Sequence, residues 1–91
     1  YHTCGITTTG ASYCWGANYA GQLGNGTEND AVAPQLVSGG QVFARLSAGG
    51  SHSCGVTTAT GEIWCWGDNS TGQLGLGSNT GSLVPVRVTF P

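Results

Sequence analysis

Charged side chains are scarce in this sequence of 91 residues, and lysine is absent. Two arginines and four acidic residues give a formal net charge of −2. Proteins that bind nucleic acids neutralise phosphates with clustered lysine and arginine, and anionic membrane surfaces attract polybasic segments. Arg45 and Arg87 stand apart in the sequence, so the composition argues against nucleic acids and membrane surfaces as partners. The apolar runs are also too short to insert into a membrane.

Helical patterning is missing as well. Apolar residues do not recur at spacings of three and four over a helical length, and 17 glycines interrupt the chain. Only proline is a poorer helix former than glycine. The apolar residues instead form short blocks between turn-type residues, which is typical of strands. The sequence therefore predicts an all-β fold.

The sequence repeats itself with an offset of about 50 residues. Residues 2–8 match residues 52–58, residues 13–18 match residues 64–69, and residues 21–27 match residues 72–78. A period of this length is typical of solenoids, propellers and arrays, whose units cannot bury their apolar faces alone. We therefore divide the chain into two repeat units, an incomplete unit at residues 1–41 and a second unit at residues 42–91.

Four antiparallel strands are expected in the second unit, at residues 42–48, 52–57, 62–66 and 84–88. The first unit contains counterparts of the last three, at residues 3–8, 12–15 and 35–37. The counterpart of the opening strand would precede Tyr1. A sheet that lacks a strand exposes unpaired amides and carbonyls, which are a template for another chain. We therefore expect a neighbouring segment or a partner to complete the first unit.

Two cysteines flank each predicted hairpin: Cys4 with Cys14, and Cys54 with Cys65. Directly opposed strand residues bring their Cα atoms to about 4.5–5.5 Å, within the disulfide range. A disulfide within each hairpin is the favoured interpretation, and it would imply an oxidising compartment. Two alternatives stay open. The thiols could be free and pack as small apolar groups, or each pair could bind a metal with the histidine two positions before its first cysteine.

The same register pairs an aromatic residue with a glycine in both hairpins. Gly5 would face Tyr13, and Gly55 would face Trp64. An aromatic ring over a strand glycine is a favourable cross-strand pair. The register that brings the cysteines together is therefore self-consistent.

Four further residues are candidate glycan sites, Asn25 and Asn69 for glycosylation and Tyr19 and Trp64 for contact with a ligand. Asn25 and Asn69 begin Asn-x-Thr sequons in glycine-rich loops, although chance is the simpler explanation in a chain rich in these residues. Tyr19 and Trp64 could stack on a sugar ring if they are exposed, although packing in the core is the simpler role for Trp64.

No motif in the sequence predicts catalysis. His2 and His52 occupy equivalent repeat positions, whereas a catalytic group is normally unique within a repeat array. The serines and threonines lack a distinctive histidine or acid partner. No predicted helix follows the glycine runs to present amides to a phosphate. We therefore expect the protein to need no cofactor or metal and not to be an enzyme.

The order of these features resembles the repeat of the regulator of chromosome condensation family (RCC1-like repeats). The most specific segment, Trp-Gly-x-Asn-x-x-Gly-Gln-Leu-Gly, spans residues 15–24 and again residues 66–75, and Pro34 and Pro85 follow the two copies. The resemblance covers nearly the whole chain. It implies a seven-bladed β-propeller of four-stranded blades, of which this chain carries two, the first without its opening strand. The cysteine-containing variant looks like bacterial, exported members.

Members of this family share a protein-binding disc and little chemistry, and a fold does not determine a function. We therefore expect a non-enzymatic propeller segment that acts as a scaffold or protein-interaction module outside or on the surface of a bacterial cell. Its expected partners are proteins or further copies of itself. The alternative is a carbohydrate-binding propeller. A third hypothesis is an intracellular regulator with exchange-factor activity, although basic chromatin-binding elements are absent.

Overall fold

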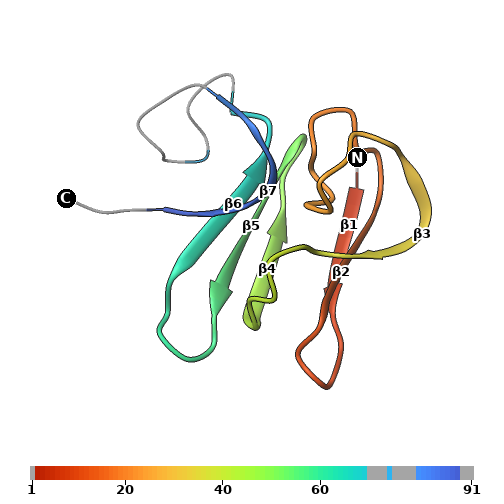
Figure 1. Ribbon diagram of the computed structural model, residues 1–91. Coiled ribbons are helices and arrows are strands. Elements are labelled where there is room, and N and C mark those ends of the chain that lie inside the picture. Colours follow the sequence, from red (N-terminus) through yellow and green to blue (C-terminus); the bar gives the residue numbers. More distant parts are fainter. Residues whose placement is uncertain (1, 70–73, 75–79, 89–91) are drawn as a thin grey trace.

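The computed structural model describes residues 2–69, 74 and 80–88, which form two antiparallel β-sheets side by side (Figure 1). The first sheet has the strand order β1-β2-β3 and the second has the order β4-β5-β6-β7. The strands are β1 (His2–Ile6), β2 (Ser12–Gly16), β3 (Ala31–Leu36), β4 (Phe43–Ala48), β5 (His52–Thr57), β6 (Ile63–Gly67) and β7 (Ser82–Arg87). The predicted all-β fold is confirmed, with one strand fewer in the first sheet. These described residues contain no helix that is long and apolar enough to cross a membrane.

Both hairpins adopt the register that the cysteines indicated. In the hairpin of β1 and β2, Cys4 lies opposite Cys14 and Gly5 lies opposite Tyr13. The equivalent pairs are opposed in the hairpin of β5 and β6. Successive side chains of a strand point to opposite faces of the sheet. Each cysteine pair therefore shares one face with the preceding histidine, and the glycine and aromatic residue share the other face.

The last strand of each sheet begins earlier than the sequence predicted. β3 starts at Ala31 rather than Gln35, and β7 starts at Ser82 rather than Val84. An irregularity between Cys14 and Gly16 in β2, and an equivalent one in β6, lets the pairing continue. Such bulges insert an extra residue into one strand of a pair, and no simple alternation of side chains reveals them.

The outer edge of each sheet is protected against further strand pairing. β3 and β7 each contain a proline, which offers no amide hydrogen to another strand. Gln35 Nε2 donates to the carbonyls of Ala33 and Pro34 at 3.2 and 3.4 Å. Ser82 Oγ donates to the Val84 carbonyl at 2.6 Å. Polar groups of the chain itself therefore occupy edge carbonyls that another chain could otherwise bind.

The core lies between the two sheets. Its buried members are Cys14, Leu23, Val37, Phe43 and Trp66. Leu23 comes from the glycine-rich loop after β2, and Trp66 comes from β6 in the other sheet. The rings of Phe43 and Trp66 have centroids 5.8 Å apart. Full burial of a large apolar side chain contributes about 1.5–3 kcal/mol, so packing between the sheets stabilises both of them.

Candidate functional site

The two sheets meet at the main-chain carbonyl of Gln22, in the loop after β2. Ser53 Oγ in β5 donates to this carbonyl at 2.7 Å, and Trp66 Nε1 in β6 donates to it at 2.9 Å. All three residues are fully buried. A buried hydrogen bond contributes about 1 kcal/mol net, but the loss of one partner costs the full desolvation of the group left behind. We call Gln22, Ser53 and Trp66 the seam, because they fix the second sheet against a loop of the first.

Gly24 makes this close approach of the loop and the indole possible. Its φ is +67°, and a Cβ atom at this position would lie 2.6 Å from Trp66 Nε1. The left-handed backbone and the lack of space both require glycine. The tryptophan and the glycines of the repeated motif therefore act between neighbouring units as well as within one unit.

His2 extends the seam from β1. Its Nε2 atom lies 2.6 Å from Ser53 Oγ. Because the serine hydroxyl donates to the Gln22 carbonyl, Nε2 carries the hydrogen and Nδ1 is the basic nitrogen. Nδ1 is buried and has no hydrogen-bond partner among the described residues. Burial lowers the pKa of His2, and the positive charge of His52 lowers it further.

Both cysteine pairs form disulfides within their hairpins, Cys4 with Cys14 and Cys54 with Cys65. The paired Cα atoms lie 4.0 and 4.1 Å apart, respectively. Bonded sulfurs do not act as thiolate ligands, and residues 2–69, 74 and 80–88 contain no group of three or more side chains suited to a metal ion. Cys4 Sγ lies 3.9 Å from the seam hydroxyl of Ser53. Whether the bonds form in the cell stays a prediction.

The asparagine of the repeated motif organises the loop that follows it. Asn18 is fully buried, and its Oδ1 accepts from the Leu23 amide at 2.9 Å. Its Nδ2 donates to the carbonyls of Thr27 and Asn29 at 2.8 and 3.0 Å. One side chain therefore holds both ends of the loop that carries Gln22 and Gly24.

The two candidate glycosylation sites have different surroundings. Asn69 is 1% exposed, and its Nδ2, the atom that a glycan would modify, donates to the Thr80 carbonyl at 2.9 Å. Asn25 is half-buried, and its Oδ1 accepts from the amide and the hydroxyl of Thr27 at 3.2 and 2.9 Å. Asn69 thus has the structural role of Asn18, and Asn25 is the more accessible of the two. Apart from Leu74, the second copy of the Gly-Gln-Leu-Gly segment lies outside the described residues.

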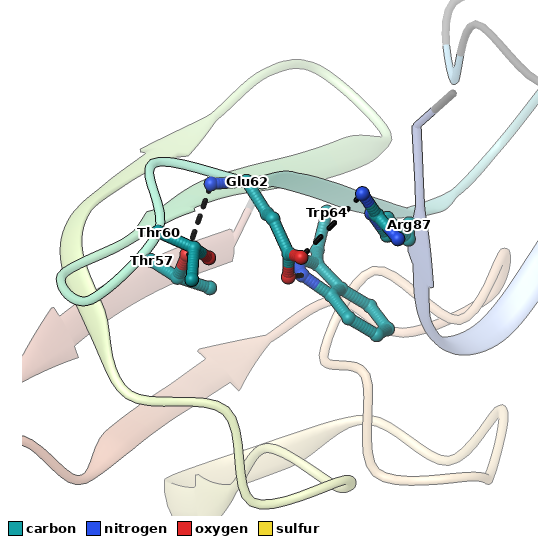
Figure 2. A network of polar contacts seen from close by, with 5 residues as sticks. All are labelled: Thr57, Thr60, Glu62, Trp64 and Arg87. Carbon is teal, nitrogen blue, oxygen red and sulfur yellow. Dashed lines mark hydrogen bonds and ion pairs between the residues drawn. The ribbon is translucent and has the colours of Figure 1, made fainter. Parts of the chain in front are cut away.

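Tyr19 and Trp64 do not form one binding platform. Tyr19 is 57% exposed in the loop after β2, and its hydroxyl is hydrogen-bonded to Ser51 Oγ. Trp64 is half-buried in β6, packs against the core and donates from Nε1 to Glu62 Oε1 at 3.4 Å. Figure 2 shows the Glu62 carboxylate between this indole and Arg87, with which it forms an ion pair at 3.5 Å. Of the two aromatic residues, Tyr19 is the one available to a partner.

The long loops gather at one end of the sheets, opposite the turns of the two hairpins (Figure 1). We call this part the loop end: residues 17–30, 49–51 and 68–69. Three of the four acidic residues, Glu28, Asp30 and Asp68, belong to it. Arg45 lies in β4 and Arg87 in β7. The loop end is therefore acidic and carries an exposed tyrosine.

Sequence reasoning missed the seam. Ser53 occupies the repeat position of Thr3, so a hydroxyl before the cysteine of each unit was a signal. The acceptor, the main-chain carbonyl of Gln22, gave no signal in the sequence, since every residue has a carbonyl group. Asn18 and Asn69 were visible as repeated residues, but nothing local indicated that their side chains are buried.

A family model for the regulator of chromosome condensation (RCC1) repeat matches residues 9–56 and 60–91, and a second model of this repeat matches residues 43–73. The chain belongs to the RCC1 repeat family. The first matched repeat begins in the first sheet and ends in the second, so the sequence repeat is out of phase with the sheets. The first match contains Gln22 and Ser53, one from each sheet, whereas Trp66 falls in the second match.

Relatives of the chain include long eukaryotic proteins. The human probable E3 ubiquitin-protein ligase HERC4 is 41% identical over 93% of this chain, which covers 8% of that protein. The Arabidopsis thaliana ultraviolet-B receptor UVR8 is 39% identical over 97% of this chain and 20% of its own length. Human protein RCC2 is 38% identical over 98% of this chain and 17% of its own length. The chain thus spans a fifth or less of these relatives.

Solved structures of RCC1-type propellers share the fold. Prp20p from Saccharomyces cerevisiae superimposes with a TM-score of 0.87 at 22% identity, over 99% of this chain and 24% of that protein. Human WBSCR16 superimposes with a TM-score of 0.81 at 28% identity, over 98% of this chain and 23% of that protein. The two sheets are therefore blades of an RCC1-type β-propeller.

The relatives correct two expectations drawn from the sequence. The statement that the protein is not an enzyme is wrong, because relatives in human, rat and mouse are named probable E3 ubiquitin-protein ligases. The exported location in a bacterium is also wrong, because the relatives described above are human and Arabidopsis thaliana proteins. Protein partners are supported by these relatives. Self-association and glycan contact stay predictions.

Proposed function

We propose that the chain is the part of an RCC1-type propeller that binds a basic protein surface through its loop end. The observation that supports this most directly is that Glu28, Asp30 and Asp68 all belong to the loop end, which also carries the exposed Tyr19. Fields of one sign steer a partner of opposite sign and raise the rate of association. Tyrosine supplies a large contact area with few rotatable bonds, as is common at protein interfaces.

The relatives supply candidate partners of the right charge. Prp20p is described as binding Gsp1p and histones, and a second structure contains Kap60 bound to yeast RCC1. Histones are rich in lysine and arginine, so an acidic surface on a chain without lysine complements them in sign. Because the identity to Prp20p is 22%, this partner is part of the proposal.

The loop end is held in place before any partner arrives. Asn18 bonds both ends of its loop, and the Tyr19 hydroxyl is tied to Ser51 in the turn between β4 and β5. The amide of Asp68 donates to the Ser51 carbonyl at 2.9 Å, which connects a third loop. A preorganised surface loses less conformational entropy on binding. The loop end therefore has the rigidity that a binding surface needs.

The test is a binding measurement with the purified chain, using core histones and Gsp1p as separate probes. Replacing Tyr19→Ala together with Glu28→Gln should weaken histone binding by about tenfold, since a central aromatic contact and one charge are lost. The effect should be larger at low salt, because screening weakens interactions between exposed charges.

Glu62→Gln is the matched control, because it removes the same charge at the opposite end of the sheets. It should leave the affinity unchanged. Equal losses in both variants would point to a nonspecific effect of net charge and contradict the proposal. If the original chain did not bind histones, this would contradict the proposal that its partner is a basic protein.

A further inference from the structure

A recess lies at the hairpin end of the first sheet, opposite the loop end (Figure 1). We call it the hairpin recess: residues 9–12, at the turn between β1 and β2, and residues 36–42, which lead from β3 to β4, line it. The amide of Val37 donates to the Ser12 carbonyl at 2.9 Å and so fastens one wall to the other. The volume is about 340 Å³, within the range of about 300–1,000 Å³ that is usual for ligand sites.

Two buried polar atoms of the hairpin recess have no hydrogen-bond partner in the part of the chain that the structure describes, Ser12 Oγ and Gln41 Oε1. Ser12 is only 4% exposed. Its side chain points to the same face of the sheet as that of Cys14, two positions later, which packs between the sheets. The Gln41 amide lies over Gly39, where a Cβ atom would be 2.6 Å from Oε1. Buried polar groups are nearly always paired, so these two atoms need a partner from outside.

The fold itself does not require a hydroxyl at this position. Ser12 lies opposite Ile6 in the first hairpin, and its counterpart Ile63 lies opposite Val56 in the second. An apolar side chain therefore fits the same place in a sheet of this kind. A buried hydroxyl without a partner costs free energy, so the serine indicates a role in binding.

The lining of the hairpin recess defines the chemistry of its occupant. None of the described residues that line it is charged, so a charged group would lose its hydration without compensation. None is aromatic either, so a sugar ring would find no ring to stack on. Gln41 Oε1 accepts a hydrogen bond, and the Ser12 hydroxyl can donate one. One N–H group and one carbonyl meet both needs, and a peptide main chain supplies them.

We propose that the hairpin recess binds an uncharged peptide segment of a protein partner. A main-chain N–H of the segment donates to Gln41 Oε1, and a carbonyl accepts from Ser12 Oγ. An aliphatic side chain of the segment packs against Val37 and Val42, which form the apolar part of the lining. An apolar contact with a few polar groups that fix orientation is typical of ligand sites. The recess and the loop end lie at opposite ends of the sheets, so this proposal does not rest on the basic partner.

NMR titration of the full chain with the capped tripeptide acetyl-Ala-Leu-Ala-amide tests the proposal. The main-chain amide of Ser12 and the side-chain amide of Gln41 should shift, with a dissociation constant of about 1 mM for a ligand of this size. Lysine in place of the central leucine should weaken binding about tenfold, because its charge would be unpaired in the recess. Glucose at the same concentration should produce no shift.

Two variants of the chain test the polar contacts. Ser12→Ala should weaken peptide binding about five- to tenfold. Its urea midpoint should stay unchanged or rise, since the hydroxyl has no partner to lose among the described residues. Gln41→Ala, outside the strands, should weaken binding to a similar extent. Ser47→Ala is the matched control, because Ser47 is an exposed serine of β4 outside the recess, and it should leave both measurements unchanged.

Three results would overturn the proposal. The first is no shift of the Ser12 and Gln41 amides at millimolar peptide. The second is a lower urea midpoint in Ser12→Ala, which would mean that the hydroxyl has a partner within the chain. The third is an equal response to glucose or to the lysine peptide, which would mean that the recess does not select an uncharged peptide. None of these results bears on histone binding at the loop end.

Discussion

Ser53 Oγ donates to the main-chain carbonyl of Gln22 at 2.7 Å, so a strand of the second sheet supports a loop of the first. The two residues are 31 positions apart and neither has any exposed surface. The same hydroxyl accepts from His2 and the same carbonyl accepts from Trp66. Stability of the chain therefore depends on a polar network between the sheets as well as on apolar packing.

Replacing Ser53→Ala should destabilise the chain by about 1–3 kcal/mol, because His2 Nε2 loses its partner and the Gln22 carbonyl loses one of two donors. Urea unfolding followed by tryptophan fluorescence measures this change. Thr3→Ala is the matched control, because Thr3 holds the same repeat position but is exposed. This substitution should change the free energy of unfolding by no more than about 0.5 kcal/mol. Similar losses in both variants would mean that the seam hydroxyl has no special role.

Replacing Asn18→Ala should loosen the loop after β2 and cost about 2–3 kcal/mol, since the Leu23 amide and two carbonyls lose a buried partner. Exchange of the Leu23 amide should accelerate at the same time, as measured by NMR. Asn29→Ala serves as the control, because the Asn29 side chain is exposed and its main-chain carbonyl is retained. If the Leu23 amide still exchanged slowly in the Asn18→Ala variant, this would contradict the role of Asn18 in holding the loop.

The hairpins could be predicted because their information is local. The spacing of Cys4 and Cys14, and the glycine opposite Tyr13, specify one register, which is the register observed. The start of β3 at Ala31 could not be predicted, because the irregularity between Cys14 and Gly16 shifts the pairing without any change in residue type.

The candidate site was harder to predict than the hairpins. The acceptor at Gln22 is a main-chain carbonyl, and the burial of Asn18 and Asn69 depends on how distant segments pack. The compartment was predicted wrongly because cysteine pairs were taken to imply export. The human and Arabidopsis thaliana relatives contradict that step.

Removing either disulfide should destabilise the chain by about 3 kcal/mol, since sequence separations of 10 and 11 residues close short loops in the unfolded state. The double variants Cys4→Ala/Cys14→Ala and Cys54→Ala/Cys65→Ala test each bond, by urea unfolding with and without a reducing agent. A reducing agent should lower the stability of the original chain to below that of either variant. Mass spectrometry of the non-reduced protein that finds four free thiols would contradict both bonds.

Acidification should weaken the seam through His2. Burial lowers the pKa of His2 in the folded protein below its unfolded value of 6.5. Its contribution to the free energy of unfolding is therefore fully present above pH 6.5 and is lost as the pH falls through the lower folded pKa. Urea unfolding between pH 8 and pH 4 should show this loss in the original chain. The loss should be absent in the His2→Gln variant.

His52→Gln provides the comparison for this pH dependence, because it removes one of the positive charges that lower the pKa of His2. The chain with this change should keep a loss of stability in acid, but a smaller one, since burial of His2 remains the main cause. Identical pH profiles for the original chain and His2→Gln would mean that the imidazole accepts its second proton without cost. That result would require a partner for Nδ1, and so would place a hydrogen-bond acceptor where the described residues provide none.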